Sequence, residues 1–201
     1  MATAITYGDD YGYFYGPSRM YQPETKCRLV WSSDTENSML PFKKHYLFKD
    51  TEVPMIVVDP RLTSIAKKAT VHLRLRPGTD GALANGLAHI ILKEGLEDRD
   101  FLDNWGHGVA EYEEYIESFT PEKTSEITGI EKELIIKAAR LYGGNKPSQI
   151  SLSPQATVHS SDPAQNYRAI ILLAALTGNV DIKGVNRAPG GVHEKDISMH
   201  D

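Results

Sequence analysis

Two stretches decide the fold of this chain: VPMIVVDPR at residues 53–61 and RLRPGTDGAL at residues 74–83. The first contains a short β-branched apolar run, 55–58, which is typical of a strand buried on both faces of a parallel sheet. A second run, 71–75, predicts the next strand. A helix with apolar residues at helical spacing is expected after it, with Thr79 as a plausible N-cap.

Polar residues follow both strands. Asp59 and Arg61 come directly after the first, and Gly78 and Asp80 follow the second at the start of the helix. The carboxyl ends of parallel strands share one edge of the sheet, where ligands of open α/β folds bind. Arginine and helix amides suit phosphate, and a carboxylate can accept the paired N–H groups of guanine. A nucleotide-type site is predicted, the ordinary alternative being an ion pair and a helix cap.

The rest of the chain alternates predicted strands and helices, which indicates an α/β fold with a mainly parallel sheet and flanking helices. The first core strand is expected at 27–31 and the fourth at 149–152. An aromatic set is expected to pack into the core: Phe101, Trp105, Tyr112, Tyr115 and Phe119. The segment 39–49 is expected to be either helical or irregular. Helices are expected at 63–68, 80–93, 98–105, 109–118, 121–128, 131–142 and 163–176.

Composition narrows the function classes. The net charge of −5 speaks against a nucleic-acid partner. The longest apolar run, 169–176, is too short to span a membrane, and residues 1–16 lack the pattern of a secretory signal. The compartment of the parent protein is left open between cytoplasmic and exported. No G-x-G-x-x-G or P-loop pattern is present, so an ordinary NAD site or P-loop is not expected.

The single cysteine, Cys27, excludes an internal disulfide and a cysteine-only metal or iron–sulfur site within the chain. The seven histidines are scattered, with no His-x-x-x-His pair on a helix, and no metal site built by this chain is predicted. No set of nucleophile, base and acid stands at a recognisable spacing, so no catalytic residue is assigned.

Two further loops are expected at the same edge of the sheet. Residues 32–34 follow the first strand, and Gln155 and His159 follow the fourth. A capping turn is the alternative interpretation of 32–34, and a surface position is the alternative for His159. His89, within a helix, is expected to pack or to be half exposed.

Taken together and in order, these motifs resemble the molybdopterin oxidoreductases, the large catalytic subunits of the dimethyl sulfoxide reductase and formate dehydrogenase type. The resemblance covers about 27–190 and implies a dinucleotide-binding-like α/β domain, with 1–26 as an irregular lead-in and 191–201 as a tail. The motifs that carry it are LVWSSDTENS at 29–38, IVVDPRLT at 56–63, LRPGTDGAL at 75–83, EGLED at 94–98, Phe101-Leu102, TGI at 128–130, IKAA at 136–139, Gln155 and LTGN at 176–179.

The resemblance implies roles for individual residues. Asp59 and Arg61 would meet the nucleotide, Gly78 would let the backbone approach it closely, and Asp80 would read guanine. These are the residues that the strand-end argument also selects.

Three more residues take roles from the resemblance alone. Ser33 and Asp34 would line the diphosphate–ribose loop, and Gln155 matches a polar loop that faces the cofactor. The family commonly has Gly-Ser-Asn where this chain has Ser32-Ser33-Asp34. A carboxylate at position 34 repels phosphate unless it points to ribose hydroxyls.

The resemblance further implies the function. The chain is expected to be a fragment of a larger multidomain enzyme, binding one guanine dinucleotide arm of a bis(molybdopterin guanine dinucleotide) cofactor that carries Mo or W. The parent reaction would be two-electron redox or oxygen or hydroxyl transfer, in anaerobic respiration. The metal ligand and any iron–sulfur cluster would lie in parent segments outside this chain.

The expected partners are the pterin cofactor and the remaining domains of the parent subunit, with an iron–sulfur electron-transfer subunit left open as a further partner; no nucleic acid and no membrane span are expected. The chain alone is expected to be inactive. Two alternatives stay open: a stand-alone nucleotide-binding or interaction module without catalysis, and a plain α/β fold without a ligand.

Overall fold

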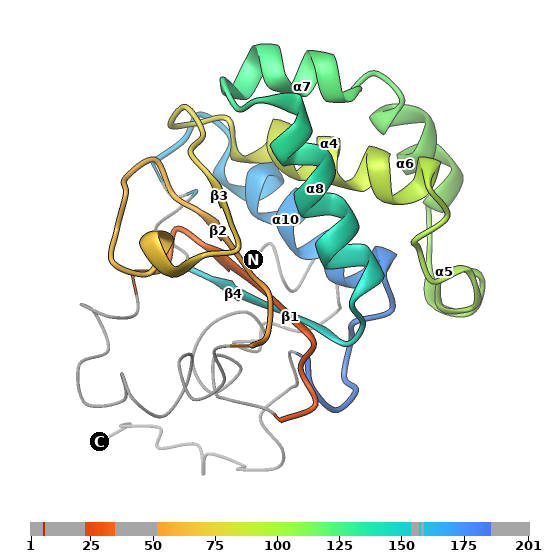
Figure 1. The fold of residues 1–201 in the computed structure, drawn as a ribbon. Coiled ribbons are helices and arrows are strands. Elements are labelled where there is room, and N and C mark those ends of the chain that lie inside the picture. Colours follow the sequence, from red (N-terminus) through yellow and green to blue (C-terminus); the bar gives the residue numbers. More distant parts are fainter. Residues whose placement is uncertain (1–5, 7–22, 35–51, 154–156, 158, 186–201) are drawn as a thin grey trace, which may run out of the picture.

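A computed structural model describes residue 6 and residues 23–34, 52–153, 157 and 159–185 of the chain. Within these residues four strands form one parallel sheet in the order β3-β2-β1-β4 (Figure 1). The strands are β1 (Cys27–Trp31), β2 (Met55–Val58), β3 (Val71–Leu73) and β4 (Ser148–Leu152). The α/β fold with a parallel sheet is confirmed.

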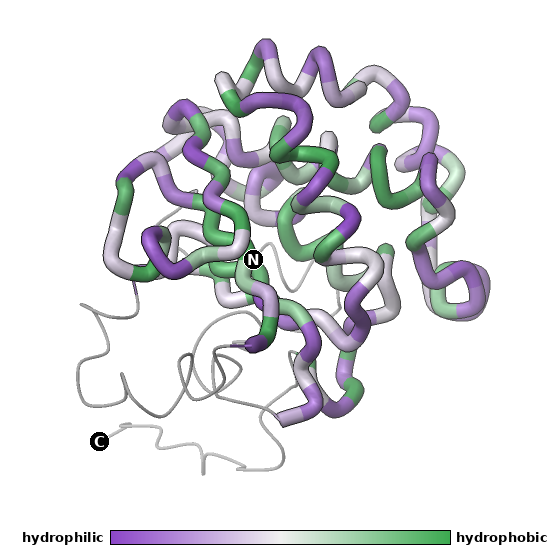
Figure 2. The backbone as a smooth tube through the Cα atoms, viewed as in Figure 1, coloured by the Kyte–Doolittle hydropathy of each residue, from purple (hydrophilic) through white to green (hydrophobic). Residues whose placement is uncertain are grey.

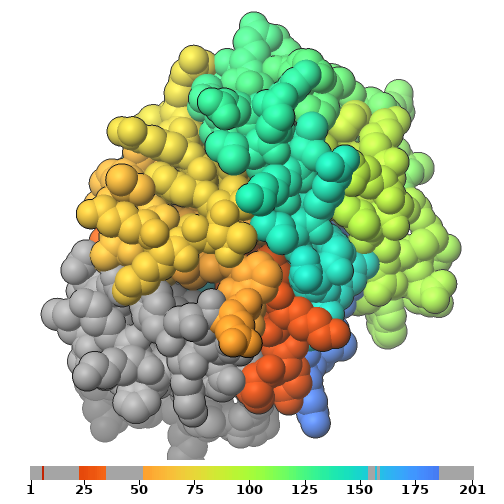
Figure 3. Space-filling model, viewed as in Figure 1, coloured from red at the N-terminus to blue at the C-terminus, as the bar shows by residue number. Residues whose placement is uncertain are grey.

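Three long helices cover the sheet: α4 (Asp80–Lys93), α8 (Lys132–Gly144) and α10 (Pro163–Leu176). Helix α8 packs on β1 and β3, α10 packs on β4, and α4 packs against both of these helices. In the space-filling view α8, coloured teal, lies at the surface between the yellow residues around β3 and the yellow-green residues around α5 (Figure 3). The shorter helices are η3 (Ala66–Lys68), α5 (Arg99–Trp105), α6 (Val109–Ile116) and α7 (Pro121–Thr128).

The core follows the alternation of side chains across the strands. One set of alternate residues, including Leu29 and Ile56, packs with α4, α8 and α10 in the main cluster. The other set, including Val30 and Val57, forms a second cluster with Ile65. Figure 2 shows the hydrophobic colour gathered on the strands and the long helices, and the hydrophilic colour on the outlying α5. The sheet is therefore buried on both faces, as its β-branched composition predicts.

The strand order places the candidate site. Strands β2 and β3 follow on one side of β1, whereas β4 lies on its other side, so the order reverses at β1. Open parallel sheets bind ligands outside the carboxyl ends of their strands near such a reversal. A ligand site is therefore expected beside the carboxyl end of β1, among residues that follow it or a neighbouring strand.

The structure corrects two details of the sequence-based expectations. Trp105 is 79% exposed and Tyr115 is 59% exposed, so they do not pack in the core, whereas Tyr112 and Phe119 pack against it. The reason is that α5 and α6 are short outer helices that each bury a single residue. The second predicted strand ends at Leu73 rather than at residue 75. Expectations for 1–5, 7–22, 39–49 and 191–201 lie outside the described residues.

A buried polar network ties α10 to β4 and α8. Asn179 is 1% exposed, and its Oδ1 accepts a hydrogen bond from the backbone N of Ser148 at 2.9 Å. Its Nδ2 donates to Oγ1 of Thr177 at 2.7 Å. The hydroxyl of Ser148 donates to the carbonyl of Tyr142 at 2.8 Å. The residues after α10 thus close the amino end of β4 without leaving its first N–H unsatisfied.

Cys27 is expected to be unreactive in the native chain. It is 0% exposed at the start of β1, and burial raises the pKa of its thiol to about 12, so little thiolate forms near neutral pH. Ellman's reagent at pH 8 should detect no thiol in the folded chain and one in denaturant. Rapid labelling of the native chain would contradict the tightly packed β1.

Candidate functional site

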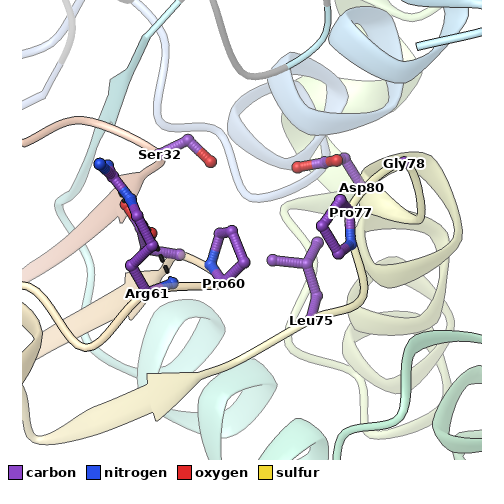
Figure 4. A pocket seen from close by; sticks show the side chains of 8 residues that line it. Ser32, Pro60, Arg61, Leu75, Pro77, Gly78 and Asp80 are labelled. Atoms are coloured by element: carbon purple, nitrogen blue, oxygen red, sulfur yellow. Dashed lines mark hydrogen bonds and ion pairs between the residues drawn. The ribbon is translucent and has the colours of Figure 1, made fainter. Parts of the chain in front are cut away.

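A cavity of about 250 Å³ opens beyond the carboxyl ends of β1, β2 and β3 (Figure 4). It brings together four residues that the strand-end argument selected from two separate stretches. In Figure 4 Arg61 stands on one wall and Asp80 on the opposite wall, with Pro60, Leu75 and Pro77 between them. The lining residues are Ser32, Asp59, Pro60, Arg61, Leu75, Pro77, Gly78 and Asp80.

Asp59 holds Arg61 in place. The carboxylate is 3% exposed, and its Oδ1 accepts from the backbone N of Arg61 at 2.8 Å and from Nε at 3.2 Å, while Oδ2 accepts from Nη2 at 3.3 Å. The hydrogen bond and charge of Asp59, with a smaller effect of Asp34, raise the pKa of Arg61. The arginine side chain remains 67% exposed. Asp59 therefore positions a permanent cation that can still reach a ligand.

Asp80 is held by a residue that the sequence did not point to. Its Oδ1 accepts a hydrogen bond of 2.7 Å from the indole Nε1 of Trp31, which is fully buried at the end of β1. Asp80 is 4% exposed, and this burial raises the pKa of its carboxyl although the indole hydrogen bond opposes the shift. A buried tryptophan N–H needs an acceptor, which is the signal that could have predicted such a contact.

The first turn of α4 has no side-chain cap. Thr79 occupies the N-cap position as expected, but its hydroxyl donates to the carbonyl of Arg76 at 2.7 Å instead of accepting from the helix. Gly78 precedes it with φ +87°, a backbone conformation that glycine adopts without strain. The hydroxyl of Thr79 thus leaves the amides of the helix start uncapped, although the Asp80 carboxyl accepts from its own N–H, and the helix dipole favours a negative group there.

At the end of β1 the structure places Ser32, rather than Ser33 or Asp34, in the cavity wall. Ser32 has φ 45°, and Figure 4 shows its hydroxyl pointing across the cavity toward Asp80. Ser33 is 5% exposed and Asp34 is half-buried, so their expected contacts with a diphosphate–ribose group stay predictions. A left-handed φ at Ser32 also explains why glycine suits this position.

The loop after β4 is described only in part. Gln155 lies outside the described residues, and His159 is exposed. His89 is 8% exposed and packs within α4, with Nδ1 3.1 Å from the carbonyl oxygen of Ile116, as expected for a structural histidine.

A parallel sheet with flanking helices, and with a charged cavity at the carboxyl ends of its strands, defines a domain of the α/β class. Comparison with known proteins identifies its family. The family model for molybdopterin oxidoreductases matches residues 2–195, so the chain belongs to the molybdopterin oxidoreductase family. The resemblance read from the motifs is confirmed.

Relatives of known activity show the same kinship. The alpha subunit of F420-dependent formate dehydrogenase from Methanocaldococcus jannaschii is 36% identical over 166 residues, 81% of this chain and 24% of that protein. Dimethyl sulfoxide reductase DmsA from Escherichia coli is 40% identical over 165 residues, 72% of this chain and 20% of that protein.

A solved structure agrees with the fold. Acetylene hydratase from Pelobacter acetylenicus superposes with a TM-score of 0.74 at 28% identity, over 89% of this chain and 24% of that one. The chain therefore spans about a quarter of the length of these relatives.

Neither a metal cluster nor a membrane helix occurs in the described part of the chain. No three histidine, cysteine, aspartate or glutamate side chains gather there in a way that could hold a metal ion. None of the helices in the same residues has the length and apolar character needed to cross a membrane.

Proposed function

We propose that this chain is the part of a molybdopterin oxidoreductase catalytic subunit that binds one guanine dinucleotide arm of a bis(molybdopterin guanine dinucleotide) cofactor with Mo or W. One observation carries the proposal: the carboxyl ends of three strands bring a cation, Arg61, and a buried carboxylate, Asp80, to opposite walls of one cavity. When bound, the cofactor supplies the metal centre for two-electron redox or for oxygen or hydroxyl transfer.

The residues present fit the nucleotide end of such a cofactor. The guanidinium of Arg61 can donate to phosphate, and the amides at the start of α4 favour the same negative charge. Asp80 can accept from the N–H groups of guanine, while Pro60, Leu75 and Pro77 offer an apolar surface to the base. A cavity of about 250 Å³ is smaller than the roughly 300–1,000 Å³ of whole-ligand pockets, so it suits one end of a dinucleotide.

The wider assignments follow from the same proposal. Residues 27–190 form the cofactor-binding domain, and Ser33, Asp34 and Gln155 contribute further contacts along the dinucleotide. The pterin contacts other parts of the parent subunit, and those parts also supply the metal ligand and hold any iron–sulfur cluster. The parent subunit acts in anaerobic respiration. Turnover then requires those parts, and this chain alone is inactive toward substrates.

Binding of guanosine diphosphate tests the proposal, because this molecule carries the guanine, ribose and diphosphate of the cofactor arm. Calorimetric titration of the purified chain should show saturable binding that is tighter than for adenosine diphosphate. Arg61→Gln should weaken it by about tenfold or more, because charge-assisted hydrogen bonds to phosphate are lost. The backbone N of Arg61 would still hold Asp59, so the fold should be unaffected.

The matched control is Arg99→Gln. Arg99 pairs with Glu97 and Glu113 far along the chain from the cavity residues, and it does not line the cavity. Its replacement should leave the affinity unchanged. Equal affinity for the guanine and adenine nucleotides, or equal losses in the two arginine variants, would rule out the proposed site.

A further inference from the structure

A second and larger cavity, of about 610 Å³, lies between α6 and α10 over the first turns of α4. It shares Gly78 with the first cavity, which we call the nucleotide cavity after the proposed function, and both cavities border the start of α4. None of its other lining residues has a side chain with a role in the proposed function. Its volume falls within the roughly 300–1,000 Å³ typical of small-molecule sites. It is therefore a candidate site in its own right.

One wall of this second cavity is aromatic. Tyr112 and Tyr115 come from α6 and Phe119 follows that helix, and the rings of Tyr115 and Phe119 lie 5.5 Å apart at an angle of 52°. Tyr115 is 59% exposed, an unusual position for a large ring. The floor is made of small α4 residues, Gly81 and Ala82, which leave room beside the rings. Such a wall favours a flat ring that can stack or meet the ring edges.

The opposite wall carries a cation with no acidic partner among the described residues. Arg168 on α10 donates from Nη1 to Oε1 of Gln165 at 3.1 Å, a neutral acceptor. Its Nε is buried and has no hydrogen-bond partner in the described part of the chain. Asp162 also lines the cavity, but its Oδ1 accepts from the backbone N of Gln165 and caps α10. A guanidinium that lines a cavity without an acidic partner favours an anionic ligand, which its exposed Nη1 can reach.

Two further features point to the same charge. Asn85 is 6% exposed in the floor, and its Oδ1 accepts from the hydroxyl of Tyr112 at 3.3 Å, which leaves Nδ2 without an acceptor among the described residues. The first turn of α4 also borders the cavity with the positive end of its dipole, whereas Asp162 already caps the first turn of α10. Arg168 and Asn85 thus offer donors, beside the capping carboxylate of Asp162, to a ligand that lies against the aromatic wall.

From these features we propose that the second cavity binds a planar aromatic anion, an arene carboxylate or a ligand of the same chemistry. The ring lies against Tyr115 and Phe119, and the carboxylate accepts from Arg168 and Asn85. The two cavities meet at Gly78 and the start of α4, and their other lining residues differ.

Calorimetry with naphthoate, and with naphthamide as its neutral counterpart, tests the proposal. One naphthoate should bind per chain, about tenfold tighter than naphthamide. Arg168→Gln should lower the naphthoate affinity to that of naphthamide and leave naphthamide unchanged, whereas Arg168→Lys should retain part of the preference for the anion. Tyr115→Ala should weaken both ligands, because the ring contact is common to them.

Control variants separate this site from general surface binding. Arg99→Gln and Trp105→Ala remove an exposed arginine and an exposed aromatic ring of α5, outside the cavity, and should change nothing. The affinity of Arg168→Gln for guanosine diphosphate should equal that of the parent chain. A wrong assignment of the second cavity can therefore be told apart from a wrong assignment of the nucleotide cavity. Absence of saturable naphthoate binding, more than one site per chain, equal affinity for the amide, or an equal loss in Arg99→Gln would overturn the proposal.

Discussion

Replacing Asp80 by asparagine is expected to weaken the binding of guanosine diphosphate by about 100-fold. The variant should no longer bind guanosine diphosphate more tightly than inosine diphosphate. The carboxylate of Asp80 lines the nucleotide cavity, and guanine presents two neighbouring N–H donors that a carboxylate can accept. An asparagine would turn a donor toward one of them. Inosine lacks the exocyclic amino group, so its binding should be affected less.

The same substitution should make the free chain more stable at neutral pH. Burial raises the folded-state pKa of Asp80 above its ordinary value of 3.8, so its stabilising contribution is present below that value and is lost as the pH rises through the folded pKa. The asparagine variant has no charge to bury at this position, and its amide oxygen can still accept from Trp31. The melting temperature of Asp80→Asn should exceed that of the parent chain at pH 7, and the difference should shrink toward pH 4.

Weaker binding together with higher stability would identify Asp80 as a residue kept for its ligand. Asp103→Asn, on the exposed surface of α5, is the matched control and should alter neither the affinity nor the melting temperature. A variant at Asp80 that lost stability at pH 7 while keeping its preference for guanine would assign this carboxylate a structural role instead.

Asn179→Ala is expected to lower the free energy of unfolding by about 3 kcal/mol, because it leaves a buried N–H of Ser148 without an acceptor and opens a small cavity. Both hydrogen bonds of the asparagine side chain, to Ser148 and to Thr177, are fully buried. Urea denaturation measures the loss as a lower midpoint with an unchanged slope.

The control for Asn179 is another asparagine that bonds to the backbone but is exposed. Asn104 on α5 donates from Nδ2 to the carbonyl of Asp100 at 2.7 Å, and Asn104→Ala should change the stability by less than about 0.5 kcal/mol. Similar losses in the two variants would mean that burial of the network adds nothing. Because the network does not line the nucleotide cavity, Asn179→Ala should keep its affinity for guanosine diphosphate in buffer without urea.

The sequence predicted those elements whose signals are local. The strand 55–58 and the helix 163–176 were placed correctly because an uninterrupted apolar run marks the first, and Pro163 after the capping Asp162 marks the start of the second. The meeting of Asp59, Arg61, Gly78 and Asp80 at one edge of the sheet is consistent with parallel strand geometry and with the family motifs, which select the same residues.

The remaining details depend on contacts between distant residues. The hydrogen bond from Trp31 to Asp80 spans 49 positions, and no periodic pattern predicts it. Whether Ser32 or Ser33 enters the cavity depends on the backbone turn at Ser32, with φ 45°. The aromatic residues of α5 and α6 have core-like composition, but those helices lie at the outside of the layer, where Trp105 and Tyr115 remain exposed.

The bonds between Asp59 and Arg61 have a consequence for selectivity among anions. A phosphate that reaches the arginine meets a guanidinium already neutralised by an adjacent carboxylate. Free orthophosphate therefore shares the guanidinium with Asp59, and the roughly tenfold gain expected from Arg61 is not enough to hold it alone. A nucleotide would make the same contact and add base contacts on the far wall, so under the proposed function this edge of the sheet is expected to favour whole nucleotides over inorganic phosphate.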